Sequence, residues 1–373
     1  METISVGLIG TGFMGKCHAL AWNAVRPVFG DCAAIRLAKL ADVDARLAAE
    51  KADAFGFQAS TTNWRDLLDD PQIDVVSVTA PNAFHPEMAI EALKAGKHVW
   101  CEKPMAPRLE DALRMRQAAR ESGHVAALGY NYIQNPMVRQ IGRLLSENAI
   151  GEVNHVRIEM DEDFMADPAA LFYWKSEASS GYGALDDFAV HPLSLIWTLL
   201  GRIRSVMADM AMPYAERPLA GGGTRAVETC DIASVLFRLE SGASGILAAN
   251  RSAWGRKGRI AVQIFGSAGS IVFDQERMNE LQVYRAGGQP ADAGYTTMLA
   301  GPAHEPYGQF VPAPGHSLGF NDLKVIECRE LLSAIAGKPS RLIDFEKGVE
   351  IECAVHAMAE SFRKRAWVDV AYG

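Results

Sequence analysis

Two residues near the middle of the chain could supply acid–base chemistry. Asp187 and His191 are four residues apart, so on a helix their side chains share one face and lie within hydrogen-bonding range. A carboxylate that orients an imidazole fixes its tautomer and raises its basicity, which suits the removal of a hydroxyl proton. The alternatives are a capping aspartate with a buried structural histidine, or a metal site. A metal ion would need a third and a fourth ligand nearby, and the sequence has no His-Glu-x-x-His or similar spacing.

A lysine in the first third of the chain is a second candidate for catalysis. Lys103 belongs to Glu102-Lys103-Pro104, which directly follows a predicted strand at 98–101. The carboxyl ends of parallel strands form the ligand-binding edge of an open α/β sheet. An ammonium at that edge could polarise a carbonyl oxygen or stabilise a developing alkoxide. The alternative is an ordinary surface lysine in a loop.

The amino-terminal stretch predicts a binding site for a dinucleotide. An apolar strand at 4–9 runs into Gly10-Thr11-Gly12-Phe13-Met14-Gly15, and a helical pattern follows at 16–25. In this motif the first glycine permits a tight turn, the second lets the backbone approach a pyrophosphate, and the third lets helix and strand pack closely. The helix N–H groups and the helix dipole then face the phosphate. A P-loop would need Ser or Thr after Lys16 to ligate Mg²⁺, but Cys17 stands there, so the Rossmann interpretation is favoured.

An acidic residue at the end of the second predicted strand favours NAD over NADP. Residues 34–42 predict a strand that ends at Asp42, 27 residues after Gly15. The usual spacing is about 20 residues, and we attribute the excess to an insertion around 27–31. A carboxylate there accepts hydrogen bonds from the ribose hydroxyls and repels a 2′-phosphate. Asp42 could instead only cap the helix that begins near Val43.

Other candidates lie in turns and loops. The strand at 73–79 ends in a turn at the same sheet edge, which contributes Thr79, Pro81 and Asn82. His85 opens the next helix and could contact a nicotinamide or simply start that helix. Trp174 could stack on a sugar ring or lie in a core. Tyr307 belongs to a Gly/Pro-rich loop at about 286–320, whose length is typical of a lid or a substrate wall.

The order of the predicted elements indicates an α/β protein. Strands alternate with helices up to Asn131, which argues for right-handed βαβ units and a doubly wound parallel sheet. After that residue strands follow one another, which predicts a mostly antiparallel sheet in a second domain. A helix near 185–200 could cover one face of this sheet, and a second subunit could cover the other. The later predicted strands are at 153–160, 203–212, 229–239, 243–250, 259–265, 270–274 and 280–285.

Composition excludes several classes of protein. The 373 residues are 49% apolar and 22% charged, with a net charge of −8 and no run of Lys and Arg, which argues against a nucleic-acid or membrane partner. The six cysteines are scattered without a Cys-x-x-Cys pair, as in a reducing compartment. We see no signal peptide, and the most apolar stretch, 192–200, is too short to span a bilayer. A cytoplasmic location is therefore expected.

Taken in order, four motifs resemble those of the glucose–fructose oxidoreductase, inositol dehydrogenase and MocA family. They are Gly10 to Gly15, Thr79-Ala80-Pro81-Asn82 with His85, Cys101-Glu102-Lys103-Pro104, and Gly183-Ala184-Leu185 with Asp187 and His191. The similarity spans essentially the whole chain. It implies an N-terminal NAD(P)-binding Rossmann domain at 1–130. It also implies a C-terminal α/β domain at 131–373 with a large, open, mainly antiparallel sheet for substrate binding and for assembly into a homodimer or homotetramer.

Within the family the chain resembles sugar dehydrogenases of the levoglucosan dehydrogenase kind. The supporting stretches are Tyr130-Asn131-Tyr132, residues 250–256, residues 301–304 and Pro312-Ala313-Pro314. Two positions depart from many relatives, which have a basic residue near Asn131 and a second Asp shortly after the histidine, where this chain has Ser194. Side chains at both positions could contact the substrate, so the identity of the substrate stays open.

The resemblance implies an NAD-dependent oxidoreductase that moves a hydride between a ring hydroxyl of a sugar, anhydrosugar or cyclitol and the nicotinamide. Catalysis would rest on Lys103, Asp187 and His191. The alternatives are an NAD-using glycosidase that acts by oxidation and elimination, and a non-catalytic NAD(H)- or sugar-binding sensor. The expected substrate contacts are Lys103, Asn131, Trp174, Asp187, His191 and Tyr307. The expected cofactor contacts are Gly10, Thr11, Gly12, Phe13, Met14, Gly15, Asp42, Thr79, Pro81, Asn82, His85, Glu102 and Lys103.

Overall fold

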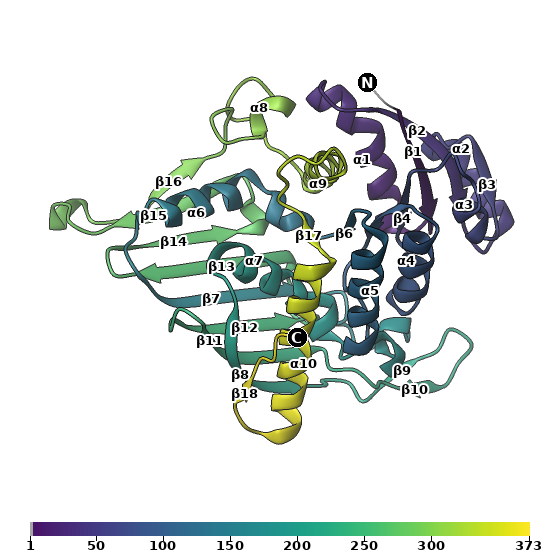
Figure 1. The fold of residues 1–373 in the computed structure, drawn as a ribbon. Helices are drawn as coiled ribbons and strands as arrows, with labels where there is room; N and C mark the ends of the chain where they lie inside the picture. Colours follow the sequence, from purple (N-terminus) through teal and green to yellow (C-terminus); the bar gives the residue numbers. More distant parts are fainter. Residues whose placement is uncertain (1–2) are drawn as a thin grey trace. The chain divides into compact units, whose positions relative to one another are not determined.

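The structure is a computed structural model that describes residues 3–373 (Figure 1). The chain forms two compact units, and each is built from two separate stretches of sequence. The first unit contains the residues up to Gln134 together with Leu318–Val349. The second unit contains Asn135–Ser317 and Glu350–Gly373.

A seven-stranded sheet forms the centre of the first unit. Its order is β17-β6-β5-β4-β1-β2-β3, and all pairs are parallel except β17 with β6. From β6 to β3 this is the strand order of a Rossmann domain, so the predicted N-terminal fold is confirmed. The strands are β1 (Thr3–Ile9), β2 (Ala34–Ala41), β3 (Ala59–Thr61), β4 (Val75–Val78), β5 (His98–Cys101), β6 (Ala126–Leu128) and β17 (Ile343–Asp344).

Every residue of β4 is buried, which is typical of a parallel sheet with helices on both faces. Helix α1 packs against α9, and α4 packs against α5. The one polar residue of β4, Ser77, accepts a hydrogen bond of 3.0 Å from the indole N–H of Trp22 on α1. The helices of this unit are α1 (Phe13–Phe29), α2 (Ala45–Phe55), α3 (Arg65–Leu68), α4 (His85–Lys94), α5 (Leu109–Ser122) and α9 (Phe320–Ile335).

The returning segment Leu318–Val349 differs from the predicted division at residue 130, which assigned all of 131–373 to the second domain. Two contacts explain why this segment belongs to the first unit. Phe320 on α9 stacks on Phe13 at the start of α1, with ring centroids 5.7 Å apart. Strand β17 extends the parallel sheet beside β6. Neither contact is visible in the local sequence pattern.

A nine-stranded sheet dominates the second unit. Its order is β16-β15-β14-β13-β7-β12-β11-β8-β18, and only β12 and β7 pair in parallel, so the predicted, mainly antiparallel sheet is confirmed. Strand β16 and helix α8 lie inside the stretch predicted as a loop. The strands are β7 (Val153–Glu162), β8 (Ile203–Ala211), β11 (Ile232–Leu239), β12 (Ser244–Asn250), β13 (Lys257–Gly266), β14 (Gly269–Asp274), β15 (Glu280–Arg285), β16 (Thr296–Leu299) and β18 (Val368–Asp369).

Helices lie along one face of the nine-stranded sheet (Figure 1). Helix α7 packs on β7, and Ser361 of α10 accepts a 3.0 Å hydrogen bond from the backbone N–H of Ala208 in β8. The opposite face carries exposed apolar residues, among them Leu236 and Ile246. The remaining α-helices and strands are α6 (Pro136–Ser146), α7 (Val190–Leu200), α8 (Tyr307–Phe310), α10 (Phe345–Lys364), and the hairpin of β9 (Glu216–Pro218) and β10 (Thr224–Ala226).

Across residues 3–373, no helix combines the length and the apolar composition needed to cross a bilayer.

A buried acid lies in the core of the second unit. Asp186 is 2% exposed, and its carboxylate accepts a hydrogen bond from the backbone N–H of Tyr182. Burial raises the pKa of Asp186 to about 7, because the bond from Tyr182 only partly offsets the loss of solvent. The folded protein therefore keeps a proton on this acid at pH values where the unfolded chain has released it.

We expect Asp186→Asn to stabilise the second unit more at pH 8 than at pH 5. Since the pKa of Asp186 is higher in the folded than in the unfolded state, the parent protein loses stability as the pH rises between about 4 and 7. The amide has no proton to lose, so the advantage of the variant should grow through this window and level off above it. Urea unfolding across the pH range measures this difference, and a difference that does not change with pH would contradict the assignment.

Candidate active site

The glycine-rich turn after β1 has the shape that a dinucleotide requires. Gly10 has a φ of +95°, and a Cβ at this position would lie 3.0 Å from the backbone of Thr79. A Cβ on Gly15 would lie 2.2 Å from the carbonyl oxygen of Gly10. Around Gly12, by contrast, no heavy atom outside the adjoining backbone lies within 4 Å of the Cβ position. The turn is therefore tight on one side and open at Gly12, where the motif places the pyrophosphate.

Helix α1 presents its amino terminus at this opening. Gly12 is the N-cap residue, Phe13 begins the helix and is 69% exposed, and the first turn contains no acidic residue. The first N–H groups of an α-helix have no partner within the helix and attract an anion. The residues present thus fit the diphosphate of a dinucleotide.

Asp42 stands beside the glycine-rich turn, directly after β2. Its Oδ2 accepts hydrogen bonds from the backbone N–H of Thr11 at 3.1 Å and from the Thr11 hydroxyl at 2.5 Å. Helix α2 is capped by Asp44, which accepts a 2.9 Å bond from the N–H of Leu47. The alternative role of Asp42 as the helix cap is therefore filled by another residue. The half-buried carboxylate of Asp42 lies where a ribose-binding acid is needed.

The turn that follows β4 is joined to two neighbouring turns. The hydroxyl of Thr79 lies 2.8 Å from the carbonyl oxygen of Ile9 and 3.0 Å from that of Gly10. His85 is 1% exposed, and its two ring nitrogens lie 2.9 Å from the carbonyl oxygens of Pro104 and Ala80. The imidazole of His85 therefore links the turn after β4 to the turn after β5.

Pro81, Asn82 and Asn131 also belong to the first unit. Pro81 precedes a short 3₁₀ helix, Asn82–Phe84, and Asn82 is buried. Asn131 is 2% exposed and begins a second 3₁₀ helix, Asn131–Gln134. Contacts of these residues with cofactor or substrate stay predictions.

Lys103 lies two residues after the end of β5 and is half-buried. The preceding residue, Glu102, is 4% exposed and forms two charge-assisted hydrogen bonds through Oε1. The ammonium of Lys324 lies 2.6 Å away, and Nε2 of His18 lies 2.9 Å away. Burial would raise the pKa of Glu102, but these two groups outweigh it and hold the pKa below its usual range. Glu102 is therefore an ionised carboxylate inside the fold.

In the second unit, Asp187 and His191 lie around an irregular helix start. Leu185–Ala189 forms a π-helical turn, and α7 begins after it at Val190. The predicted helix over 185–200 is thus present, but with a wider first turn. Such turns are rare and occur frequently at functional sites. Both side chains are buried, at 7% and 4% exposure.

Two cations beside Asp187 were not predicted from the sequence. The ammonium of Lys175 lies 2.6 Å from Oδ1 of Asp187, and a guanidinium nitrogen of Arg251 lies 3.7 Å from its Oδ2. Arg251 is fully buried and also pairs with Asp231 at 2.7 Å. One signal was available, because Arg251 belongs to the stretch 250–256 that resembles sugar dehydrogenases.

Trp174 lies next to this cluster because it directly precedes Lys175 in the sequence. It begins a 3₁₀ helix, Trp174–Ser176, and the ammonium of Lys175 lies 5.7 Å from the centre of its ring. The half-buried indole is therefore adjacent to the cation that binds Asp187. A contact between Trp174 and a sugar ring stays a prediction.

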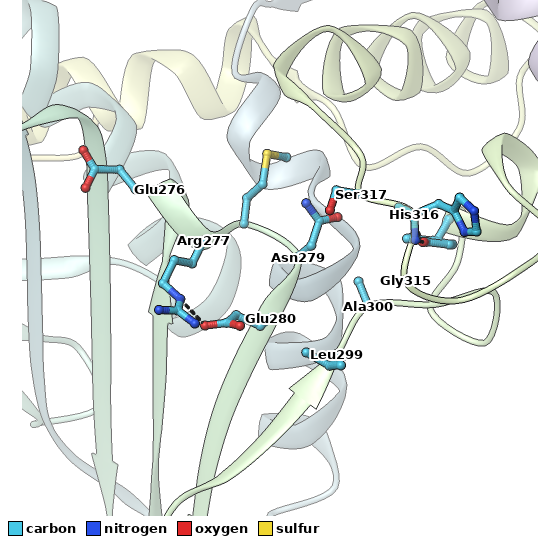
Figure 2. A pocket seen from close by; sticks show the side chains of 11 residues that line it. Glu276, Arg277, Asn279, Glu280, Leu299, Ala300, Gly315, His316 and Ser317 are labelled. Atoms are coloured by element: carbon cyan, nitrogen blue, oxygen red, sulfur yellow. Dashed lines mark hydrogen bonds and ion pairs between the residues drawn. The ribbon is translucent and has the colours of Figure 1, made fainter.

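The structure places Tyr307 in a different part of the second unit. Its hydroxyl bonds with the backbone of His316, whose N–H donates to it over 3.1 Å, and so closes the loop after α8. Tyr307 lines a cavity of about 420 Å³ whose wall includes neither Asp187 nor His191. Figure 2 shows this cavity, with the ion pair of Arg277 and Glu280 on one side and His316 on the other. A substrate contact by Tyr307 stays a prediction.

Across residues 3–373, no group of three or more His, Cys, Asp and Glu side chains is arranged to hold a metal ion. Asp187 is instead surrounded by protein cations.

The chain is similar to known oxidoreductases. Residues 4–130 match the oxidoreductase family with an NAD-binding Rossmann fold, and residues 138–272 match the GFO/IDH/MocA C-terminal domain. Levoglucosan dehydrogenase from Pseudarthrobacter phenanthrenivorans is 38% identical over 99% of both chains. A solved complex of levoglucosan dehydrogenase with NADH and levoglucosan matches 99% of this chain and 100% of its own, with 38% identity and a TM-score of 0.95.

The chain is also similar over its whole length to a second solved structure. An NAD-binding oxidoreductase from Klebsiella pneumoniae is 36% identical over the whole of both chains, with a TM-score of 0.95. The family resemblance predicted from the motifs is confirmed. The chain belongs to the GFO/IDH/MocA family of oxidoreductases, and its first unit carries the NAD-binding Rossmann fold of that family.

Proposed function

We propose that the protein is an NAD-dependent dehydrogenase that oxidises a ring hydroxyl of a sugar, anhydrosugar or cyclitol. The observation that carries this proposal is the full-length similarity to a dehydrogenase solved with NADH and levoglucosan. The chain contains Lys103, Asp187 and His191, the residue types that alcohol oxidation needs. Trp174 beside Lys175 adds an aromatic face of the kind on which sugar rings stack.

The first unit would hold the cofactor through residues already described. Backbone N–H groups at the start of α1 would bind the diphosphate, and Asp42 would bind the adenosine ribose. The negative charge of Asp42 disfavours a 2′-phosphate, so NAD is preferred to NADP. A bound nicotinamide would supply the acceptor for the hydride of the alcohol carbon.

The side chains would carry out the proton transfer and stabilise the charges that develop. His191 takes the proton of the hydroxyl group, and Asp187 stabilises the resulting imidazolium. Lys103 would stabilise the negative charge that develops during oxidation of the alcohol. Lys175 and Arg251 hold the Asp187 carboxylate in place through the contacts given above.

A panel of sugars, anhydrosugars and cyclitols tests the reaction itself. We expect NADH to accumulate with at least one of these alcohols and to form more slowly, or not at all, with NADP⁺. Absorbance of the reduced nicotinamide measures both. Cleavage of an aryl glycoside without net NADH would instead indicate a glycosidase. Binding of NADH without turnover of any substrate would indicate a sensor.

Lys103→Met and His191→Ala should each reduce turnover by about 10²-fold or more, because each removes one proton-transfer or charge-stabilising group. NADH binding, followed by nicotinamide fluorescence, should persist, since neither group belongs to the glycine-rich turn. Lys94→Met, at an exposed position on α4, is the matched control and should behave like the parent. Near-normal turnover in either active-site variant would refute its assigned role.

We also propose that copies of the chain associate through the uncovered face of the nine-stranded sheet. On this face Leu236 and Ile246 are directly opposite each other on β11 and β12, at 48% and 39% exposure. Paired apolar side chains on a long open sheet favour burial against a second sheet. A second, separate proposal is that the protein is cytoplasmic. The six free cysteines support a reducing compartment.

The double variant Leu236→Glu/Ile246→Glu should lower the molar mass measured by light scattering to that of a smaller assembly. Four carboxylates, two from each copy, would be brought together at a two-fold interface. Val43→Glu, at a 93% exposed position in the first unit, is the control and should leave the mass unchanged. An unchanged mass in the double variant would place the interface elsewhere.

A further inference from the structure

We propose that Lys324 is a positioning residue for the ammonium of Lys103, and that it acts through the carboxylate of Glu102. This inference rests on the proposed catalytic role of Lys103. Lys324 lies on α9, 222 residues from Glu102 in sequence, and is fully buried. A buried ammonium that the reaction does not use directly needs another explanation.

The contacts form a continuous path from Lys324 to the backbone of Lys103. The Lys324 ammonium lies 2.6 Å from Oε1 of Glu102. The other oxygen of that carboxylate, Oε2, accepts a 3.3 Å hydrogen bond from the N–H of Lys103. One carboxylate therefore joins a buried cation to the peptide group from which the catalytic side chain extends.

The Glu102 carboxylate is enclosed by other groups as well. His18 on α1 lies 2.9 Å from Oε1. Gly129, just after β6, leaves the space that the carboxylate occupies, because a Cβ there would lie 2.4 Å from Oε1. Contacts from α1, α9 and the end of β6 thus fix the carboxylate and the turn after β5.

Stability alone does not account for this arrangement. Replacing a buried ion pair by apolar residues is often neutral or stabilising, so such a pair is weak evidence for a stabilising role. Lys324 also lies 2.6 Å from Glu327, an acid that burial drives to a pKa of about 7. Glu102, in contrast, stays ionised. Of the two acids that contact Lys324, the one that keeps its negative charge therefore lies at the turn that carries Lys103.

A second buried lysine of the same unit provides a matched control. Lys97 is 5% exposed and lies before β5, whereas Glu102 lies after it. Its ammonium donates hydrogen bonds to the carbonyl oxygens of Asp70 at 2.7 Å and Ile73 at 2.8 Å. Lys97→Met removes a buried ammonium from the other end of the strand, away from the turn after β5.

The test compares Lys324→Met with Lys97→Met below their unfolding temperatures, with turnover expressed per NADH-binding site. We expect kcat to fall about 10- to 100-fold in Lys324→Met, the scale of a small misplacement of a catalytic group, with KM for NAD⁺ little changed. Lys97→Met should lose stability and keep its kcat. The double variant Lys103→Met/Lys324→Met should be no slower than Lys103→Met alone.

The outcomes separate this inference from the proposed function. Normal kcat in Lys324→Met, or losses that multiply in the double variant, would overturn the positioning role while leaving Lys103 catalytic. Normal turnover in Lys103→Met would overturn the proposed function and this inference with it. If Lys324→Met does not fold, Lys324→Met/Glu327→Leu replaces the ion pair by apolar side chains and gives the same readout. A normal kcat in that variant likewise refutes the inference.

Discussion

The reversal of strand order at β1 and β4 is the constraint on which the first unit depends. The two strands are neighbours, but the chain continues from them to opposite sides of the sheet, so their carboxyl ends border the crevice where open α/β folds bind ligands. The turn after β1 must approach the turn after β4 closely, and Gly10 allows this against Thr79. The turn after β5, with Lys103, follows at the same edge.

Local sequence signals were sufficient to predict the parts of the fold that have local causes. The strand at 98–101 and the motif that ends it lie where the pattern placed them, because an apolar run and a proline determine both. The return of α9 to the first unit has no such signal, since Lys324 and its partner Glu102 are far apart in the chain. The spacing of Asp187 and His191 indicated a shared helix face but could not reveal a π-helical turn.

Both candidate catalytic regions hold a carboxylate through a cation from a distant segment. In the first unit Lys324 binds Glu102, and in the second unit Lys175 and Arg251 flank Asp187. Glu102 keeps its charge without access to bulk water, and the orientation of each of the two carboxylates is set by more than one contact. The side chains proposed for catalysis are thereby attached to rigid elements, as accurate placement of reacting groups requires.

The division of each unit between two stretches of sequence has a consequence for biosynthesis. During translation, the residues up to Gln134 emerge from the ribosome long before Leu318–Val349 has been synthesised. Until that segment emerges, helix α1 lacks the helix that packs against it, and Glu102 lacks its ammonium partner. The cofactor-binding unit therefore reaches its final packing only after most of the other unit has been synthesised, and the order of folding is nested rather than domain by domain.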